Sequence, residues 1–261
     1  MEFKIVTKFQ QEEKMNKEVA LYETDIQNDF SLRSGALFVR ANKPKRALPY
    51  GAEERLPNIF ALHGHAENNG WAVLGSVDRH FYEDAELIRN QGGVFEDHCM
   101  NGTKGQLRLP ELEPQKDVYI RSKDGPLMGV KIYNTAEMTA YLDAIDQGMQ
   151  LVFEKQSYDV ATNPNFDTAF RRMMAMGLKK VVVDGFATDY CVKAAVLAMV
   201  AGRDRYKKQL EIYVVADAIE AVNIDFQGQI DNEFGNKALE EMVKSGAKLV
   251  TTKDVLEGKL N

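Results

Sequence analysis

Cysteine and tryptophan are scarce in this chain of 261 residues, which has two cysteines, Cys99 and Cys191, and one tryptophan. Two cysteines cannot build a disulfide framework, so a hydrophobic core has to hold the fold together. Apolar residues make up 44% of the chain, and its length is sufficient to bury such a core. We therefore predict a globular protein with reduced thiols.

An excess of positive charge and a long apolar run are also missing. The net charge is −6 and the pI is near 5.4, which argues against a nucleic-acid partner because no domain-wide basic face is available. The longest apolar run, around residues 194–202, is too short to span a bilayer, so we expect no membrane partner. Residues 1–4 lack the apolar run of a signal peptide, and we expect a cytoplasmic location.

Strand and helix patterns alternate along the chain. The expected strands cover residues 19–24, 71–77, 151–154, 181–183, 210–216 and 247–251, and the expected helices cover residues 52–66, 135–147, 165–176, 192–199 and 236–245. This alternation predicts an α/β fold with three αβα layers around a mostly parallel, doubly wound, Rossmann-like sheet. We expect one domain over residues 1–261, preceded by a polar arm at residues 1–17.

Cys191 is the candidate nucleophile. It follows the apolar strand at 181–183 and a turn with the small residues Gly185 and Ala187. A cysteine in the first turn of a helix meets unpaired amides and the positive end of the helix dipole, which favour a thiolate and could hold an oxyanion. The alternative is a small buried apolar residue. Cys99 has no helix after it, and a structural role is favoured there.

Asp25 and Lys155 each follow a strand, as Cys191 does, and the carboxyl ends of parallel strands lie side by side. A carboxylate, an ammonium and a thiol brought together can catalyse acyl transfer, with Lys155 lowering the thiol pKa and Asp25 moving the proton. Taken singly, Asp25 could instead cap a turn and Lys155 could be a solvated charge.

Asp78, His80 and His98 offer one oxygen and two nitrogens, a ligand set that suits Zn²⁺ or Fe²⁺. The alternative is that these histidines are hydrogen-bonded structural residues. His63 and His65 form a rival metal pair, but nothing near them in sequence completes a ligand shell.

Four aromatic side chains could line a flat apolar slot for an aromatic ring: Phe30, Phe95, Tyr158 and Tyr190. Each of them could equally belong to the core.

Several short segments resemble the isochorismatase-like cysteine hydrolases, and within them the nicotinamidases (pyrazinamidases). The segments are DIQNDF at 25–30, DRH at 78–80, DHC at 97–99 followed by Gly102, Thr103 and Gly105, and GFATDYCV at 185–192. The resemblance implies hydrolysis of nicotinamide to nicotinate and ammonia through a cysteine thioester, in the isochorismatase-like fold.

The resemblance also implies roles for residues. Asp25, Lys155 and Cys191 would form a catalytic triad. The amides of Ala187 and Cys191 would form the oxyanion hole, next to a cis peptide bond between Phe186 and Ala187.

The remaining implied residues concern the metal and the substrate. Asp78, His80 and His98 would bind a divalent metal, with zinc first and iron or manganese as alternatives, and this metal would orient the pyridine nitrogen of nicotinamide. The implied substrate-binding residues are Phe30, Phe95 and Tyr190.

Two features depart from the family pattern. Arg79 stands where many relatives have tryptophan, and residues 83–86 carry carboxylates where many have a further histidine, so Asp84 or Glu86 is a candidate additional ligand. The segment at about 104–150 is longer than usual, and we interpret it as an insertion with a hairpin over residues 117–133 that serves as a lid or as a contact in a homo-oligomer.

Two other functions stay open. One is a related cysteine amidohydrolase acting on another small amide or on a ureido or carbamoyl compound. The other is a non-catalytic binding protein on the same fold.

Overall fold

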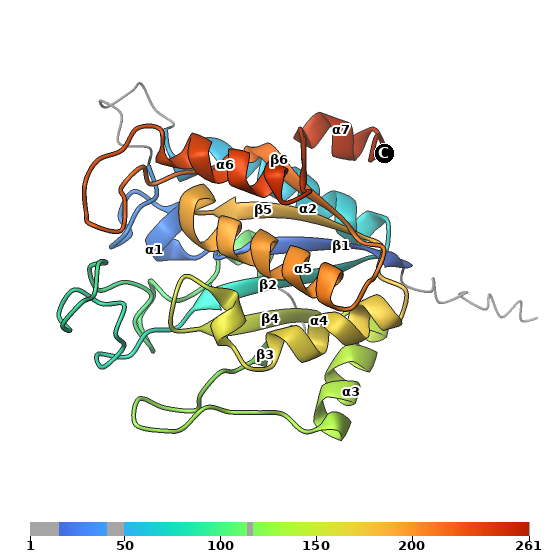
Figure 1. Cartoon of the computed structure of the whole chain (residues 1–261), viewed down its shortest axis with the longest axis horizontal. Coiled ribbons are helices and arrows are strands. Elements are labelled where there is room, and N and C mark those ends of the chain that lie inside the picture. Colours follow the sequence, from blue (N-terminus) through green and yellow to red (C-terminus); the bar gives the residue numbers. More distant parts are fainter. Residues whose placement is uncertain (1–15, 41–49, 114–116, 261) are drawn as a thin grey trace, which may run out of the picture.

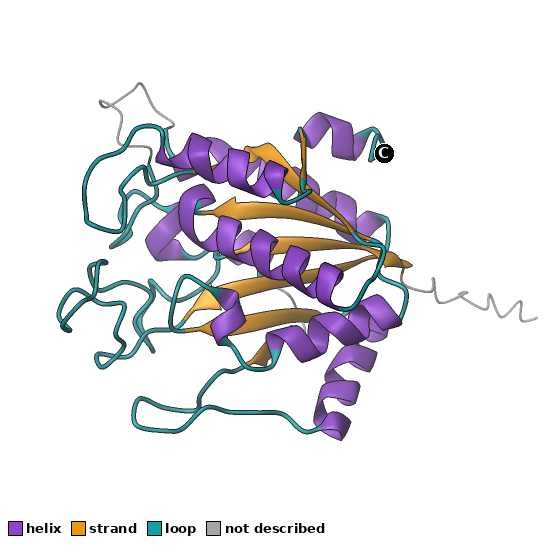
Figure 2. Cartoon of the chain, viewed as in Figure 1, coloured by secondary structure: helices purple, strands orange, loops and turns teal. Residues whose placement is uncertain are grey.

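A single parallel sheet organises the protein in the computed structural model, which describes residues 16–40, 50–113 and 117–260. The strands are β1 (Asn16–Thr24), β2 (Trp71–Asp78), β3 (Asp117–Ile120), β4 (Gln150–Lys155), β5 (Lys180–Phe186), β6 (Glu211–Glu220) and β7 (Lys248–Val250). Their order across the sheet is β3-β4-β2-β1-β5-β6-β7, and every neighbouring pair is parallel (Figures 1 and 2). The carboxyl ends of the strands therefore meet along one edge of the sheet.

Helices cover both faces of the sheet (Figure 1). The helices are α1 (Asn28–Ser31), α2 (Ala52–Asn68), α3 (Thr135–Ala144), α4 (Phe166–Ala175), α5 (Lys193–Arg205), α6 (Phe234–Lys244) and α7 (Thr252–Leu256). Apolar residues of α3, α4, α5 and α6 pack in the core on one face, and those of α1, α2 and α7 pack on the other. The predicted three-layer αβα fold is thus confirmed.

Strand β5 shows why an apolar run forms a central strand. Val181 and Val183 point into the core under α4 and α5, whereas Val182 points into the core under α2. Successive side chains of a strand alternate between faces, so a strand covered on both sides reads as continuously apolar.

The first strand begins earlier than predicted and includes the last two residues of the predicted arm. Strand β1 begins at Asn16, and the rest of the predicted arm, residues 1–15, lies outside the described residues. Within the three described ranges, no helix is long and apolar enough to cross a membrane.

The predicted hairpin over residues 117–133 is wrong. Residues 117–120 form β3, which pairs in parallel with β4 at the sheet edge. Beyond β3, a single antiparallel bridge joins Lys123 to Val130. Val130 and Ile132 are exposed, so the alternation of apolar and polar residues in this segment does not reflect one buried face of a sheet. A period of two identifies extended backbone, but it does not identify the strand's partner.

A buried charged cluster lies under α2. The Glu23 carboxylate contacts Arg108 Nη2 at 2.5 Å and His63 Nδ1 at 2.8 Å. Asp184 is the register neighbour of Glu23 on β5, and neither of its buried oxygens has a hydrogen-bond partner among the described residues. Burial raises the pKa of Asp184 well above its usual value, Glu23 adds to the rise, and Arg108 opposes it.

This raised pKa predicts a pH-dependent gain from Asp184→Asn. The folded state binds the Asp184 proton more tightly than the unfolded state, so the wild-type contribution is full at acidic pH and is lost as pH rises toward the folded pKa. Asparagine has nearly the same shape as aspartate, and its side-chain amide does not ionise in this pH range. The Tm advantage of the variant should therefore widen between pH 4 and pH 8 in thermal unfolding, and a pH-independent difference would contradict this assignment.

Candidate active site

Three strand ends bring polar side chains together at one edge of the sheet. Asp78 and Lys155 are register partners at the ends of β2 and β4. Asp25 follows the last residue of β1, and its backbone N–H donates to the Ser76 carbonyl at 3.0 Å. The parallel register therefore places Asp25, Asp78 and Lys155 at about the same level along the strand direction, at the carboxyl edge of the sheet.

The Lys155 ammonium is the centre of this group and is fully buried. Its Nζ lies 2.7 Å from Asp25 Oδ2 and 3.7 Å from Cys191 Sγ, and it also donates to Asp78 Oδ1. The carboxylate, ammonium and thiol predicted to converge do lie within contact distance of one another. Ser76 Oγ donates to Asp25 Oδ1 at 2.7 Å and holds that carboxylate in place.

Cys191 is positioned by a tight turn between β5 and α5. The turn is a π-helical segment, Thr188–Val192, in which the Val192 N–H donates to the Ala187 carbonyl at 3.1 Å. Gly185 has φ +102°, and an added Cβ would lie 2.0 Å from the Thr24 carbonyl oxygen, so only glycine fits. The peptide bond between Phe186 and Ala187 is cis, as the family resemblance implied.

The surroundings of Cys191 oppose the thiolate that its helix position alone would favour. Burial raises its pKa well above the usual value, Lys155 lowers it, and the carboxylates of Asp25 and Asp78 raise it. The predicted direction of the Lys155 effect is confirmed, but it does not outweigh burial. A base must therefore take the thiol proton before Cys191 can attack.

Asp25 is suited to take that proton. Burial raises its pKa, Lys155 lowers it and Asp78 raises it again, so the net pKa is above the ordinary value. A carboxylate with a raised pKa accepts and returns protons near neutral pH better than an ordinary aspartate. For Lys155, burial lowers the pKa, but Asp25 and Asp78 raise it further, so the ammonium stays charged.

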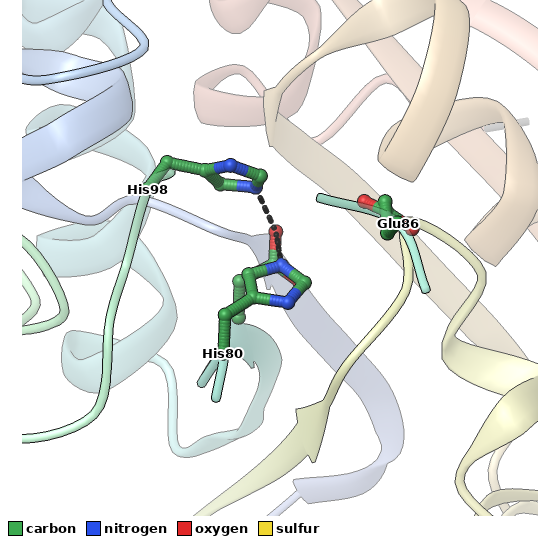
Figure 3. Close-up of side chains that lie close together, drawn as sticks. His80, Glu86 and His98 are labelled. Atoms are coloured by element: carbon green, nitrogen blue, oxygen red, sulfur yellow. Dashed lines mark ion pairs between the residues drawn. The ribbon is translucent and has the colours of Figure 1, made fainter. Parts of the chain in front are cut away.

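A second group of side chains lies beside the first and shares Asp78 with it. Asp78 Oδ2 is 3.8 Å from His80 Nε2 and 3.6 Å from His98 Nε2. Ligand atoms of these three residues and of Glu86 all lie within 4.8 Å of one another. Figure 3 shows both imidazoles facing one carboxylate, with Glu86 across from them.

The outer nitrogens of both histidines have partners that fix the inner ones. His98 Nδ1 donates to the Glu96 carbonyl at 2.6 Å, and His80 Nδ1 contacts Asp84 Oδ2 at 3.2 Å. Each Nε2 faces Asp78, and the buried His80 Nε2 makes no hydrogen bond within the described part of the chain. Metal-ligating histidines usually have this arrangement.

The same geometry separates the two candidate additional ligands. Asp84 orients His80 and accepts from the Phe81 N–H at 2.9 Å, whereas Glu86 faces the shared space. Burial raises the pKa of Glu86, and Asp78 raises it further. His80, which burial would make less basic, has its pKa raised to about 9 by Asp78 and Asp84. A group of two carboxylates and two imidazoles around one space fits a divalent cation.

The rival candidates have structural contacts. His63 is paired with Glu23, and the His65 ring packs against Trp71 at 5.1 Å. Neither belongs to a metal-compatible group among the described residues. Cys99 is fully buried, and burial raises its pKa well above the usual value, in agreement with its predicted structural role.

A small pocket opens onto both groups. Its walls are largely apolar and include all four predicted aromatic residues. The lining residues are Phe30, Leu37, Val39, Asp78, Glu86, Phe95, His98, Tyr158, Ala187, Tyr190, Cys191 and Val222. Sequence reasoning missed Leu37, Val39 and Val222, because they come from loops that carry no motif.

Gln27 and Asp29 also received no role from the sequence, although they stand in the segment at 25–30. Gln27 accepts from the Asp78 N–H and donates to the Asp78 carbonyl, both at 2.7 Å. Asp29 accepts from the Cys99 N–H at 2.7 Å, and a Cβ on Gly105 would overlap its carboxylate. These side chains fix the backbone that carries Asp78 and His98, and their spacing after β1 was the available signal.

Comparison with known proteins gives this geometry a context. Residues 134–254 match the family model described as the Isochorismatase domain. A search of curated proteins finds no match. A pyrazinamidase of Pyrococcus horikoshii in complex with zinc is 24% identical with a TM-score of 0.56, and the alignment covers 90% of this chain and 99% of that one. The chain has the isochorismatase-like fold.

Two further neighbours have the same isochorismatase-like fold. PnC1 from L. infantum in complex with nicotinate is 16% identical with a TM-score of 0.61, and the alignment covers 92% and 96% of the two chains. N-carbamoylsarcosine amidase from Thermoplasma acidophilum is 21% identical with a TM-score of 0.56, covering 90% and 96%. The family match and the neighbours together show that the chain shares the fold of these proteins.

The geometry predicts that Glu86 binds a divalent cation and that its neighbour Glu83 does not. Glu86→Gln should weaken zinc binding at least about tenfold, because it removes a charged oxygen from the group. Glu83→Gln is the matched control, since Glu83 is exposed. Isothermal titration of the metal-free protein with zinc measures both, and equal affinities of the two variants would exclude Glu86 as a ligand.

Proposed function

We propose that the protein is a nicotinamidase, which hydrolyses nicotinamide to nicotinate and ammonia. One observation supports this most: a single aromatic pocket is lined by Cys191 and also by Asp78, Glu86 and His98. A planar ring bound between these groups would place its amide at the thiol and its ring nitrogen toward the imidazoles.

In this proposal Asp25 takes the Cys191 proton as the sulfur attacks the amide carbon. The amides of Ala187 and Cys191 hold the oxyanion of the tetrahedral adduct, and the Lys155 ammonium balances the charge of the Asp25 carboxylate. The proton on Asp25 then passes to the leaving amine, and ammonia departs from the thioester. Asp25 next takes a proton from water as the water oxygen attacks the thioester carbon. The bond between this carbon and the Cys191 sulfur then breaks, nicotinate leaves, and Asp25 returns the proton to the sulfur.

Asp78, His80, His98 and Glu86 would hold a divalent metal, for which we propose zinc, and when bound it would supply a Lewis-acid contact for the pyridine nitrogen. The unpartnered His80 Nε2 and the two carboxylates support this assignment. Phe30, Phe95 and Tyr190 would enclose the ring and exclude water from the thiol.

We further propose that the chain works as one domain in the cytoplasm and takes part in the salvage of nicotinamide for pyridine nucleotides. The candidate residues lie at the ends of β2 and β4, directly after β1, in the loop after β2 and in the turn after β5, and these four strands belong to one sheet. A division between two domains would separate them.

A second candidate is hydrolysis of a carbamoyl or ureido compound, favoured by the likeness to N-carbamoylsarcosine amidase. The aromatic walls of the pocket fit a planar ring better than a small polar acyclic substrate. Ammonia release from nicotinamide, pyrazinamide and N-carbamoyl amino acids, with and without a chelator, separates the two functions. Turnover of carbamoyl compounds alone would replace the nicotinamidase proposal.

Cys191→Ala should lower kcat for ammonia release from nicotinamide by at least about a thousandfold, because it removes the nucleophile. Zinc content should stay unchanged, since Cys191 lies outside the group formed by Asp78, His80, Glu86 and His98. Ammonia assay and metal analysis of the same sample measure both effects.

Cys99→Ala is the matched control, because Cys99 is the other cysteine and faces the core. It should retain most of the activity at a temperature where it is folded. Substantial activity in Cys191→Ala would rule out the thioester route.

A further inference from the structure

The loop between β6 and α6, residues 221–233, projects beyond the carboxyl ends of the strands (Figure 1). It narrows to a tight turn in which an antiparallel bridge joins Ile224 to Ile230 and the Asp225 N–H donates to the Gln229 carbonyl at 2.8 Å. Phe226 lies at the tip of this turn. It is 45% exposed, which is unusual for so large an apolar side chain that also has ring contacts.

The base of the loop is tied to the segment that carries Cys191. The buried Asp189 carboxylate accepts from the N–H groups of Val222 at 3.0 Å and Asn223 at 2.7 Å. The Tyr190 hydroxyl donates to the Ile224 carbonyl at 2.5 Å. These bonds fix the loop relative to the thiol, two residues beyond Asp189.

The Phe226 ring packs on the two tyrosines that line the pocket. Its centroid is 5.2 Å from that of Tyr190 and 5.7 Å from that of Tyr158, and these tyrosine rings are 5.7 Å apart. It also meets Phe234 at 5.8 Å and the Lys193 ammonium at 6.0 Å, and Phe234 in turn lies 5.7 Å from Tyr190. Phe226 itself is absent from the pocket lining, so it supports this wall from outside.

We propose that Phe226 is a positioning residue that sets the size of the molecule able to reach Cys191. By holding the rings of Tyr158 and Tyr190 together it closes this side of the pocket and restricts the substrate to an amide on a single ring. As a statement about substrate class it rests on the proposed nicotinamidase function, but its effect on access to the thiol is independent of that function.

Access is tested by alkylating the full-length protein with iodoacetamide and with a bulky fluorescein-linked iodoacetamide, reading Cys191 by peptide mass spectrometry. Phe226→Ala removes the ring contacts to both tyrosines. One such contact shifts the equilibrium between the closed and the displaced positions of these rings by up to about tenfold, so the alkylation rate with the bulky reagent should rise about tenfold. The alkylation rate with iodoacetamide should change less than about twofold, because this small reagent reaches the thiol without displacing the rings of Tyr158 and Tyr190.

Three variants complete the test. Phe226→Tyr keeps the ring and should restore wild-type rates. Phe226→Leu keeps apolar bulk without the ring and should fall between wild type and Phe226→Ala, which keeps the test valid if the alanine variant is unstable. Ile230→Ala is the control on the same loop, because the Ile230 side chain is exposed and the residue joins Ile224 through a backbone bridge. The alkylation rates of this variant should match those of the wild type.

The proposal is overturned if Phe226→Ala changes neither rate, if it raises both rates equally, or if Ile230→Ala has the same effect. Equal increases would mean that the loop merely loosens the whole site.

A second measurement compares kcat and KM for nicotinamide and for a two-ring amide such as a quinoline carboxamide. Phe226→Ala should raise KM for nicotinamide with little change in kcat, and should raise kcat/KM for the larger amide. An inactive wild type with size-selective alkylation would refute the nicotinamidase function alone. An active wild type without size selectivity in either assay would refute the role of Phe226 alone.

Discussion

The buried ammonium of Lys155 is the constraint on which the site depends. A charge with no exposure to water is tolerated only when opposite charges surround it, and here Asp25 and Asp78 do so. Both carboxylates in turn need the ammonium to remain ionised. The parallel sheet makes the cluster stable, because register places the ends of β2 and β4 opposite each other and β1 next to β2.

Asp78 links the two halves of the site. One of its oxygens contacts Lys155, beside the thiol, and the other faces His80 and His98. The candidate nucleophile and the candidate cation position are therefore one carboxylate apart.

The walls of the pocket come from segments that differ in kind from its floor. Strand ends and the turn after β5 hold Asp25, Asp78, Lys155 and Cys191, whereas loops supply Glu86, His98 and the apolar or aromatic residues Leu37, Val39, Tyr158 and Val222. Loops accept substitution more readily than core strands. Substitutions in the loop residues can therefore change the size of the pocket without disturbing the groups at the strand ends.

The sequence by itself determined the strand–helix alternation, the glycine turn before Cys191 and the polar residues at the strand ends, because these patterns are local and follow from propensity and burial. Only the tertiary structure decided the rest. The place of Glu86 beside Asp78 and the two histidines, the pairing of β3 with β4, the raised pKa of Cys191 and the position of Phe226 all depend on groups distant in sequence. The sequence pattern of a strand does not specify which other strand pairs with it. A pKa depends on burial and on neighbouring charges, which are set only when the chain folds.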